Sequence, residues 1–376
     1  MSLRKSRMIL MPQEISALDA LQKRQKSLGG GSVRRIQFAH TYDNIISVEN
    51  LLGAWEEFVR GKRKKLDVQE FQHSLMDNVL TLHNELKQGT YRHGEYQAFK
   101  ISDPKPRDIH KATVRDRLVH HAIYRQLYPF FDRTFIADSY SCREGKGTHK
   151  AMNRFRSFAY KVSKNHTRTC WVLKFDIRKF FASIDQTILN DIVCHYIPDK
   201  RIVSLTSEII GSFCSYPTHQ TLPTGRIGCV HRGLPLGNLT SQMLVNVYMN
   251  EFDEYVKHTL KAKYYIRYAD DFVILDPSRR HLDDMLPAIE SFLLNRLKLQ
   301  LHPNKVSITT LASGIDFLGW VHFPDHRVLR TSTKRRMLKR AVGLDEDSAT
   351  LQSYSGMLRH GNGRKLSDRI LKCPMV

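Results

Sequence analysis

Three aspartates stand among mostly apolar residues, where an unpaired charge is costly. Asp176 follows the stretch at residues 170–175, and Asp270 with Asp271 separates two apolar runs between residues 264 and 275. A carboxylate in such surroundings needs a charged partner or a metal ion, and a divalent cation removes the repulsion between adjacent carboxylates. Oxygen ligands alone suit Mg²⁺ or Mn²⁺, and two such ions can hold both the attacking and the leaving oxygen of a phosphoryl transfer. The competing interpretation is a solvated turn, which most Asp-Asp pairs form.

The composition favours nucleic acid as the partner. Lys and Arg number 59 against 37 Asp and Glu, which gives a net charge of +22, and a charge this positive favours nucleic acid over an anionic membrane surface. The sequence has no apolar run of about 18 residues that would predict a membrane span. Its N-terminal apolar stretch is too short for a signal peptide, so we expect a cytoplasmic protein. The six cysteines form no C-x-x-C pair, so neither a zinc site nor a disulfide framework is predicted.

Strands alternate with helices around these aspartates. Apolar residues three and four apart between Phe71 and Leu86 predict a helix that ends at Gly89, and Val245, Tyr248, Phe252 and Tyr255 mark the buried face of another. We also predict a strand, turn and strand at 96–109, a helix at about 113–131, a strand at 170–177, and a hairpin at 264–275 with the Asp-Asp pair at its tip. This alternation predicts a mixed α/β sheet backed by helices.

Two of these segments resemble motifs of a known enzyme family. Asp176 is followed by Phe180-Phe181, and Asp270-Asp271 is preceded by Tyr268-Ala269, as in motifs A and C of the reverse-transcriptase palm. The resemblance extends from about residue 96 to residue 323. Within it, residues 104–107 and 115–117 resemble the fingers motifs, 233–242 resembles motif B, 301–305 motif D, and 314–320 motif E, the primer grip. Each match alone is weak, but together they are specific because all occur in the family's order.

The resemblance implies an α/β (α+β) right-hand polymerase fold. It divides the chain into a basic N-terminal extension at 1–45, fingers with N-terminal helices at 46–169, a palm at 170–323 and a short helical thumb at 324–376. The implied activity is that of an RNA-directed DNA polymerase. Its partners would be template RNA, a primer or cDNA, and deoxynucleoside triphosphates, and its cofactors two Mg²⁺ ions, with Mn²⁺ as the alternative.

The resemblance also implies roles for individual residues. It implies catalysis by Asp176, Asp270, Asp271 and Lys305, metal ligation by the three aspartates and the backbone carbonyl of Ile177, and nucleotide binding by Lys105, Arg107, Arg115, Arg117, Phe181, Leu236, Gly237 and Gln242. Arg115 and Arg117 are the first candidates for binding the triphosphate, because a guanidinium matches phosphate oxygens bidentately. For Lys105, contact with the template backbone is as well supported as contact with the triphosphate. Phe181 matches the steric gate that excludes a 2′-hydroxyl, and Phe180 is interpreted as a core residue. Lys305 matches the lysine that would protonate the leaving pyrophosphate, with a surface lysine as the alternative.

Motif B distinguishes lineages within the family. Many reverse transcriptases carry Gln-Gly-x-x-x-Ser-Pro here, whereas this chain has Leu236 in place of the glutamine and Gln242 in place of the proline. That pattern resembles the reverse transcriptases of diversity-generating retroelements, which are bacterial, archaeal or phage-encoded. The resemblance implies error-prone copying of a template-repeat RNA at its adenines, retrohoming that diversifies a target gene, and a small basic accessory protein. The alternatives are a stand-alone bacterial reverse transcriptase of another lineage (antiphage defence or group II intron-like) and a catalytically silent RNA-binding scaffold.

Overall fold

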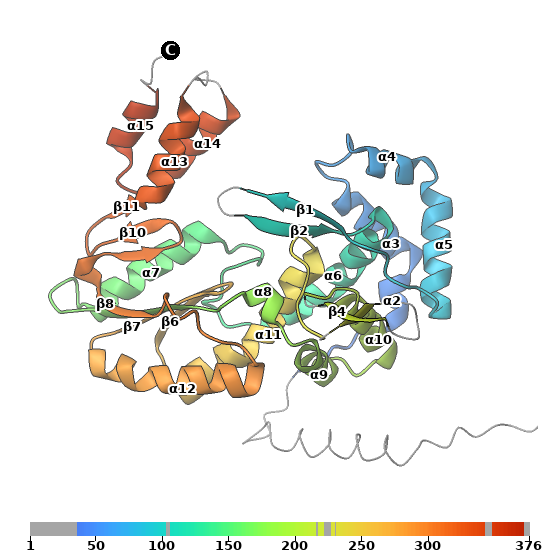
Figure 1. Ribbon diagram of the computed structural model, residues 1–376, viewed down its shortest axis with the longest axis horizontal. Helices are drawn as coiled ribbons and strands as arrows, with labels where there is room; N and C mark the ends of the chain where they lie inside the picture. Colours follow the sequence, from blue (N-terminus) through green and yellow to red (C-terminus); the bar gives the residue numbers. More distant parts are fainter. Residues whose placement is uncertain are drawn as a thin grey trace, which may run out of the picture. The chain divides into compact units, whose positions relative to one another are not determined.

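The computed structural model describes residues 36–102, 106–215, 217–221, 227–229, 231–342 and 348–371, without side-chain detail at 217–229, 369 and 371. The chain divides into two units, Met1–Gln37 and Phe38–Val376, and the elements below belong to the second (Figure 1). Within the described ranges, no helix is long and apolar enough to cross a membrane. Phe38, Tyr42 and Ile45 are buried in the core, so the folded unit begins before the predicted end of the extension at residue 45. Residues 1–35 of that extension lie outside the described ranges.

A four-stranded antiparallel sheet forms the centre of the segment predicted as the palm. Its strands are β3 (Trp171–Asp176), β6 (Tyr264–Tyr268), β7 (Asp271–Asp276) and β8 (Ser307–Thr310), in the order β6-β7-β3-β8. The pairing therefore places β3 directly beside β7, although the two are far apart in sequence. Helix α7 (Thr148–Val162) packs on β6 and β7, and α12 (Arg279–Leu297) packs on β3, β7 and β8, so that helices cover both faces of the sheet (Figure 1).

Side chains alternate between the two faces of this sheet, as the period of a strand requires. Phe175 and Phe272 join the larger core on the α12 side, whereas Val172 and Val273 join a second core on the α7 side. Asp176 lies four residues after Val172, and Asp271 lies two residues before Val273. Residues separated by an even number of positions in a strand share a face. Both carboxylates therefore lie on the face that also carries α7.

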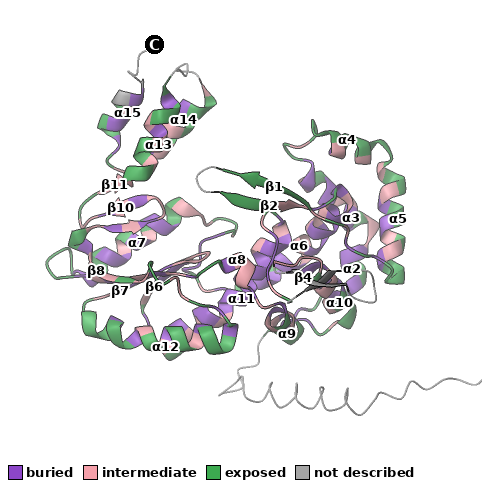
Figure 2. Cartoon of the chain, viewed as in Figure 1, coloured by how far each residue is buried: buried purple, intermediate pink, exposed green. Residues whose placement is uncertain are grey.

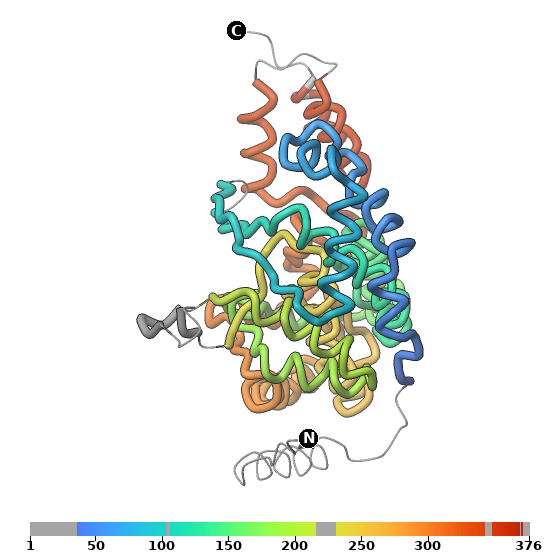
Figure 3. Tube along the Cα trace, turned by 90° about the vertical axis from the view of Figure 1, so that its right-hand side faces the viewer, coloured from blue at the N-terminus to red at the C-terminus, as the bar shows by residue number. Residues whose placement is uncertain are grey.

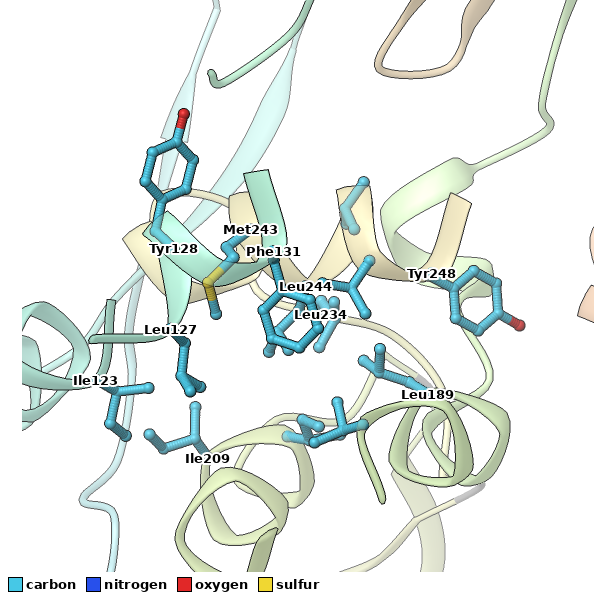
Figure 4. Close-up of a cluster of buried hydrophobic side chains, with 14 of the residues drawn as sticks. Ile123, Leu127, Tyr128, Phe131, Leu189, Ile209, Leu234, Met243, Leu244 and Tyr248 are labelled. Carbon is cyan, nitrogen blue, oxygen red and sulfur yellow. The ribbon is translucent and has the colours of Figure 1, made fainter. Parts of the chain in front are cut away.

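A group of further helices surrounds a continuous apolar core next to the sheet. They are α2 (Tyr42–Ile46), α3 (Val48–Phe58), α4 (Leu66–His73), α5 (Leu75–Gln88), α6 (Val114–Thr134), α9 (Gln186–Tyr196), α10 (Lys200–Gly211) and α11 (Leu239–Glu254), which continues as the π-helix η1 (Tyr255–Thr259). Figure 4 shows this core where Phe131 of α6, Ile209 of α10 and Leu244 of α11 meet. Helix α11 also reaches the sheet through Phe252, whose ring contacts Phe272 edge to face. The core thus ties the fingers helices to the strands.

Smaller elements complete the unit. Strands β1 (Gln97–Ile101) and β2 (Arg107–Lys111) form a ribbon, and β1 is exposed along its whole length (Figure 2). A second ribbon pairs β4 (Pro217–Thr221) with β5 (Ile227–Cys229), and a three-stranded sheet joins β9 (Ile315–Phe317), β10 (Trp320–His322) and β11 (Arg327–Leu329). The short helices are α8 (Phe180–Ser183) and η2 (Leu311–Ser313). Helices α13 (Thr331–Ala341), α14 (Ala349–Leu358) and α15 (Arg364–Leu371) share a small core of their own and lie on the side opposite α12 in Figures 1 and 3.

The predicted mixed α/β fold is confirmed, with two local differences. The apolar pattern from Phe71 to Leu86 spans two helices, α4 and α5, because Ser74 between them is not helical at φ −118 and ψ 43. The three- and four-residue spacing of apolar residues continues across Ser74 because both helices face the same core. Gly89 ends α5 in the left-handed conformation at φ 71. Cys214 is disulfide-bonded, contrary to the sequence expectation, because scattered cysteines give no spacing signal for a pair that only folding brings together.

Candidate active site

Strand pairing brings the three predicted carboxylates together. β3 and β7 are in a register that places Asp176 directly opposite Asp271, and Asp270 lies in the two-residue turn between Tyr268 and Asp271. The first residue of this turn, Ala269, has a left-handed backbone at φ 54, which L-residues adopt uncommonly. Like charges directly opposite each other destabilise a strand pair, so the arrangement indicates a function beyond folding.

Burial disfavours the ionised forms of two of these carboxyls. Burial, and after it the neighbouring Asp176 carboxylate, raises the pKa of Asp270. Burial raises the pKa of Asp271 to about 6, although Lys174 acts in the opposite direction. Asp271 Oδ1 lies 3.5 Å from Lys174 Nζ, which is an ion pair but too long for a good hydrogen bond. Among the residues that the structure describes, this buried oxygen has no hydrogen-bond partner, and it would be free to coordinate a divalent cation.

The aspartates fit a metal site that substrate phosphates and waters complete better than one built from protein ligands alone. No group of three or more His, Cys, Asp or Glu side chains in the described part of the chain could hold a metal ion by itself. Mg²⁺, however, usually binds through one or two carboxylates together with waters and substrate phosphates, which suits the opposed pair. Asp176 O accepts from His302 N and Arg178 N donates to Gln300 O, so the carbonyl of Ile177 points away from that segment. Ligation by this carbonyl stays a prediction.

The segment predicted as motif D places Lys305 beside Asp176. It runs antiparallel to the end of β3, where His302 N donates to Asp176 O over 2.8 Å, and it then turns so that Lys305 N donates to His302 O over 3.0 Å. Lys305 Nζ lies 2.8 Å from Asp176 Oδ2, with the two side chains 42% and 17% exposed. An ion pair this solvated adds little to stability. Lys305 is therefore adjacent to the carboxylates and is not an isolated surface lysine.

The two phenylalanines after Asp176 differ in burial, as the sequence analysis expected. Phe180 is 4% exposed, whereas Phe181 is partly buried and packs against the edge of the same core. Their rings meet edge to face with centroids 5.6 Å apart. Lys179 before them has a left-handed backbone at φ 47, which turns the chain from β3 into α8. Phe181 thus stays partly accessible, and its function as a steric gate stays a prediction.

Of the three predicted phosphate-binding residues that the structure describes, Arg107 lies toward the carboxylates. It begins β2 and is close enough to Asp270 to oppose, in part, the rise in pKa that burial causes there. Lys105 lies outside the described residues. Among the described arginines predicted to bind phosphate, Arg107 is therefore the one whose charge acts on the aspartates.

Arg115 and Arg117, the first candidates for the triphosphate, already have partners within the chain. The Arg115 guanidinium forms an ion pair with Glu85 and lies 4.7 Å above the ring of Tyr91. Arg117 Nη2 lies 2.6 Å from Asp67 Oδ2. A carboxylate that is already bound competes with a phosphate for the same fork of donors, so binding of a triphosphate by either arginine stays a prediction.

The segment predicted as motif B lies against strand β2. Leu236 O accepts from His110 N over 3.1 Å. Gly237 has φ 109, and a Cβ on it would lie only 3.1 Å from Ile109 Cγ2, so both backbone conformation and space favour glycine. Gln242 lies in the first turn of α11 and, like Leu236, is partly exposed. Leu236 and Gly237 thus border the same ribbon that carries Arg107.

The sequence analysis missed Lys174 as a neighbour of the carboxylates. Its Nζ contacts Asp271 and also donates to the backbone oxygen of Asp316 on β9, so it connects the segments predicted as motifs A, C and E. The sequence does contain an indication of this contact. Lys174 lies two residues before Asp176 in a predicted strand, and residues two apart share a face of a sheet.

The sheet and its carboxylates define a right-hand polymerase. Residues 100–322 match the family described as reverse transcriptase (RNA-dependent DNA polymerase), which is more than half of the 376 residues. The chain belongs to the reverse transcriptase family and carries its RNA-dependent DNA polymerase domain.

This chain is similar to several known proteins. Protein YkfC of Escherichia coli (strain K12) is 24% identical over 287 residues, which cover 67% of this chain and 71% of YkfC. The group II intron-encoded protein LtrA of Lactococcus lactis subsp. cremoris is 21% identical over 327 residues, which cover 69% of this chain but only 51% of LtrA. Among solved structures, telomerase from Candida albicans in complex with a fragment of telomeric RNA superimposes with a TM-score of 0.47 at 12% identity, over 76% of this chain and 56% of that one. None of these likenesses identifies the retroelement lineage.

Proposed function

We propose that this chain is an RNA-directed DNA polymerase that extends a primer along an RNA template with deoxynucleoside triphosphates. The observation that supports the proposal is the opposition of Asp176 and Asp271 across β3 and β7, with Asp270 in the adjoining turn. Reverse transcriptases use divalent metal ions, and we propose that Mg²⁺ is held here by these aspartates and the carbonyl of Ile177. The bound ions would make the primer 3′-hydroxyl more acidic and offset charge on the phosphates.

The residues around the aspartates perform the other steps. Lys305, beside Asp176, is positioned to give a proton to the departing pyrophosphate. Arg107, within electrostatic reach of Asp270, binds a phosphate of the nucleotide or the template. Phe181 presents a ring edge under the sugar and excludes a 2′-hydroxyl.

Primer extension on an RNA template tests the polymerase proposal. Asp270→Asn keeps the shape of the side chain but removes the charge, and we expect it to abolish extension while the protein still folds and binds RNA. Asp276→Asn is the matched control, because Asp276 lies at the other end of β7 and hydrogen-bonds Ser278 and His281. Extension by Asp270→Asn at the wild-type rate would refute the assignment of the carboxylates. Loss of extension in both variants would point to damage to the sheet.

We further propose that the enzyme belongs to a diversity-generating retroelement. The support is Leu236 and Gln242 in motif B, because a leucine cannot make the hydrogen bonds of the glutamine that many relatives carry, and lost polar contacts lower specificity strongly. The substrate would then be a template-repeat RNA, copied with errors at its adenines. A small basic accessory protein would be a partner and the cytoplasm the location.

Sequencing of cDNA from one defined RNA tests the lineage. We expect wild-type errors to concentrate opposite template adenines and Leu236→Gln to reduce them more than it reduces the rate of synthesis. Few errors, spread evenly over the four bases, would contradict the retroelement proposal. They would favour a bacterial enzyme closer to the group II intron-encoded protein LtrA, with which this chain shares 21% identity.

A further inference from the structure

A buried chain of polar groups joins α6 to the start of α11. His120 on α6 and Thr240 on α11 are each 1% exposed, and His120 Nδ1 is hydrogen-bonded to Thr240 Oγ1. His120 Nε2 lies 3.0 Å from Nε2 of His93, and His93 Nδ1 lies 2.7 Å from the carbonyl oxygen of Gly94. Four polar groups thus form one continuous path through the core.

The chemistry of these groups fixes the direction of each hydrogen bond. A carbonyl only accepts, so His93 Nδ1 carries a proton, and its Nε2 accepts while the ring is uncharged. His120 Nε2 must then donate, which leaves His120 Nδ1 to accept from the hydroxyl of Thr240. Burial lowers the pKa of His120 well below its usual value, which keeps its ring in the uncharged form that this order requires. Thr240 is therefore a donor with a single defined acceptor.

Other contacts fix the far end of the path. The backbone N of His93 donates to Glu208 Oε1 on α10 over 3.1 Å. The backbone N of Gly94 donates to Asp116 Oδ2 on α6 over 3.1 Å, and Tyr91 donates to the other oxygen of Asp116 over 2.9 Å. The segment that carries His93 is thereby held by two helices and can serve as a fixed reference for α11.

Thr240 lies between the two motif B residues that depart from the common pattern. Leu236, four residues before Thr240, precedes α11, and its carbonyl accepts from His110 N over 3.1 Å. At about 100° per residue, Gln242 is more than half a turn around α11 from Thr240. A Thr240 side chain anchored in the core therefore turns Gln242 outward, in agreement with its partial exposure.

We propose that His93 and His120 are positioning residues for the nucleotide pocket. Through Thr240 they fix the rotation of the start of α11, and with it the placement of Gln242 against the incoming base. Their contribution is to selectivity between nucleotides, because their hydrogen bonds lead to motif B and not to the carboxylates. The inference rests on the proposed polymerase function.

A set of threonine and histidine variants in the full-length chain tests this inference. Thr240→Val removes the hydroxyl with little change in shape, and Thr240→Ser retains it. His121→Phe is the matched control, because His121 is adjacent to His120 on α6, is partly buried and has an Nδ1 without a hydrogen-bond partner among the described residues. Single-nucleotide primer extension then gives kcat and KM for the correct and for each incorrect deoxynucleotide.

We expect Thr240→Val to lower the ratio of kcat/KM for correct over incorrect nucleotides by about threefold to tenfold, the effect of one typical hydrogen bond. The change should fall mainly on KM, and Thr240→Ser and His121→Phe should keep the wild-type ratio. Equal ratios for the Val and Ser variants, or an equal fall in kcat for all nucleotides, would overturn the inference. A wild-type protein that extends no primer would instead refute the proposed function itself.

A double-mutant cycle adds a second criterion. His120→Phe breaks the same hydrogen bond from its other side, so combining it with Thr240→Val should add little to the loss of selectivity that either causes alone. Additive losses would mean that the two side chains act separately, which contradicts the proposal. If His120→Phe shows no cooperative thermal unfolding, the comparison of Thr240→Val with Thr240→Ser still decides.

Discussion

Replacing Asp271 by asparagine should stabilise the metal-free protein while it impairs DNA synthesis. Asp271 lies opposite Asp176 across two strands, and burial raises its pKa to about 6. The folded chain therefore disfavours the ionised carboxyl relative to the unfolded chain. Asparagine keeps the shape and carries no charge, so it removes this penalty. The same charge is the one proposed to bind a metal, and its loss should therefore lower activity.

The size of the effect follows from the shift in pKa. A rise from the ordinary 3.8 to about 6 corresponds to about 3 kcal/mol, because each pKa unit is worth about 1.4 kcal/mol. Since the pKa is higher in the folded chain, that chain binds more protons between about pH 4 and 6, and stability falls as the pH rises through this window. We expect Asp271→Asn to raise the free energy of unfolding by about 3 kcal/mol at pH 7.5 and by roughly half as much at pH 5.

Urea unfolding in EDTA, followed by circular dichroism at both pH values, measures this difference. Asp276→Asn is the control, because it removes a carboxylate from the other end of the same strand, and we expect no comparable gain. Addition of Mg²⁺ should stabilise the wild type more than Asp271→Asn, because a ligand that binds the folded state raises its stability. A variant no more stable than wild type at pH 7.5, or equally stabilised at both pH values, would show that the buried charge is not the cause.

Four further outcomes are expected. Phe181→Ala should raise ribonucleotide incorporation in primer extension, because it opens space beneath the sugar. Lys305→Gln should lower the rate of extension at least about tenfold and the free energy of unfolding by less than about 1 kcal/mol, because its ion pair with Asp176 is solvated. Arg107→Gln should raise the KM for deoxynucleotides or template more than Arg117→Gln, whose main effect should be on stability through the lost partner Asp67. Filter-binding titrations should show RNA affinity falling steeply with salt, with a log–log slope of roughly −0.7 to −0.9 for each phosphate contact, and a flat dependence would contradict an extended phosphate footprint.

The sequence located the carboxylates because their surroundings have a strong local pattern. One short, mostly apolar run ends at Asp176 and another begins after Asp271, and both strands are found as predicted. What the sequence could not supply is the register between β3 and β7, because it depends on pairing between segments far apart in the chain. The register places Asp176 and Asp271 opposite each other.

Motif matching was less informative for the arginines, for a physical reason. A motif fixes a residue type at a position, but the function of a guanidinium depends on which anion is closest to it. Glu85 pairs with Arg115 and Asp67 pairs with Arg117. Both acids lie on helices outside the fingers motif, so the motif does not indicate them as partners. The partners of these arginines became visible only when α4 and α5 were placed against α6.

The two lysines near the aspartates are held differently, and this difference bears on the proposed chemistry. Lys174 is 21% exposed and is tied both to Asp271 and to the backbone of Asp316, so it cannot turn away without losing a buried hydrogen bond. Lys305 is 42% exposed, and the ion pair with Asp176 is its one ion pair within the described residues. If a divalent cation neutralised Asp176, the attraction that holds Lys305 would weaken, while the hydrogen bond of Lys174 to the Asp316 backbone would persist. We therefore expect Lys305 to be the lysine that turns toward a departing pyrophosphate, and Lys174 to keep β3 tied to β9.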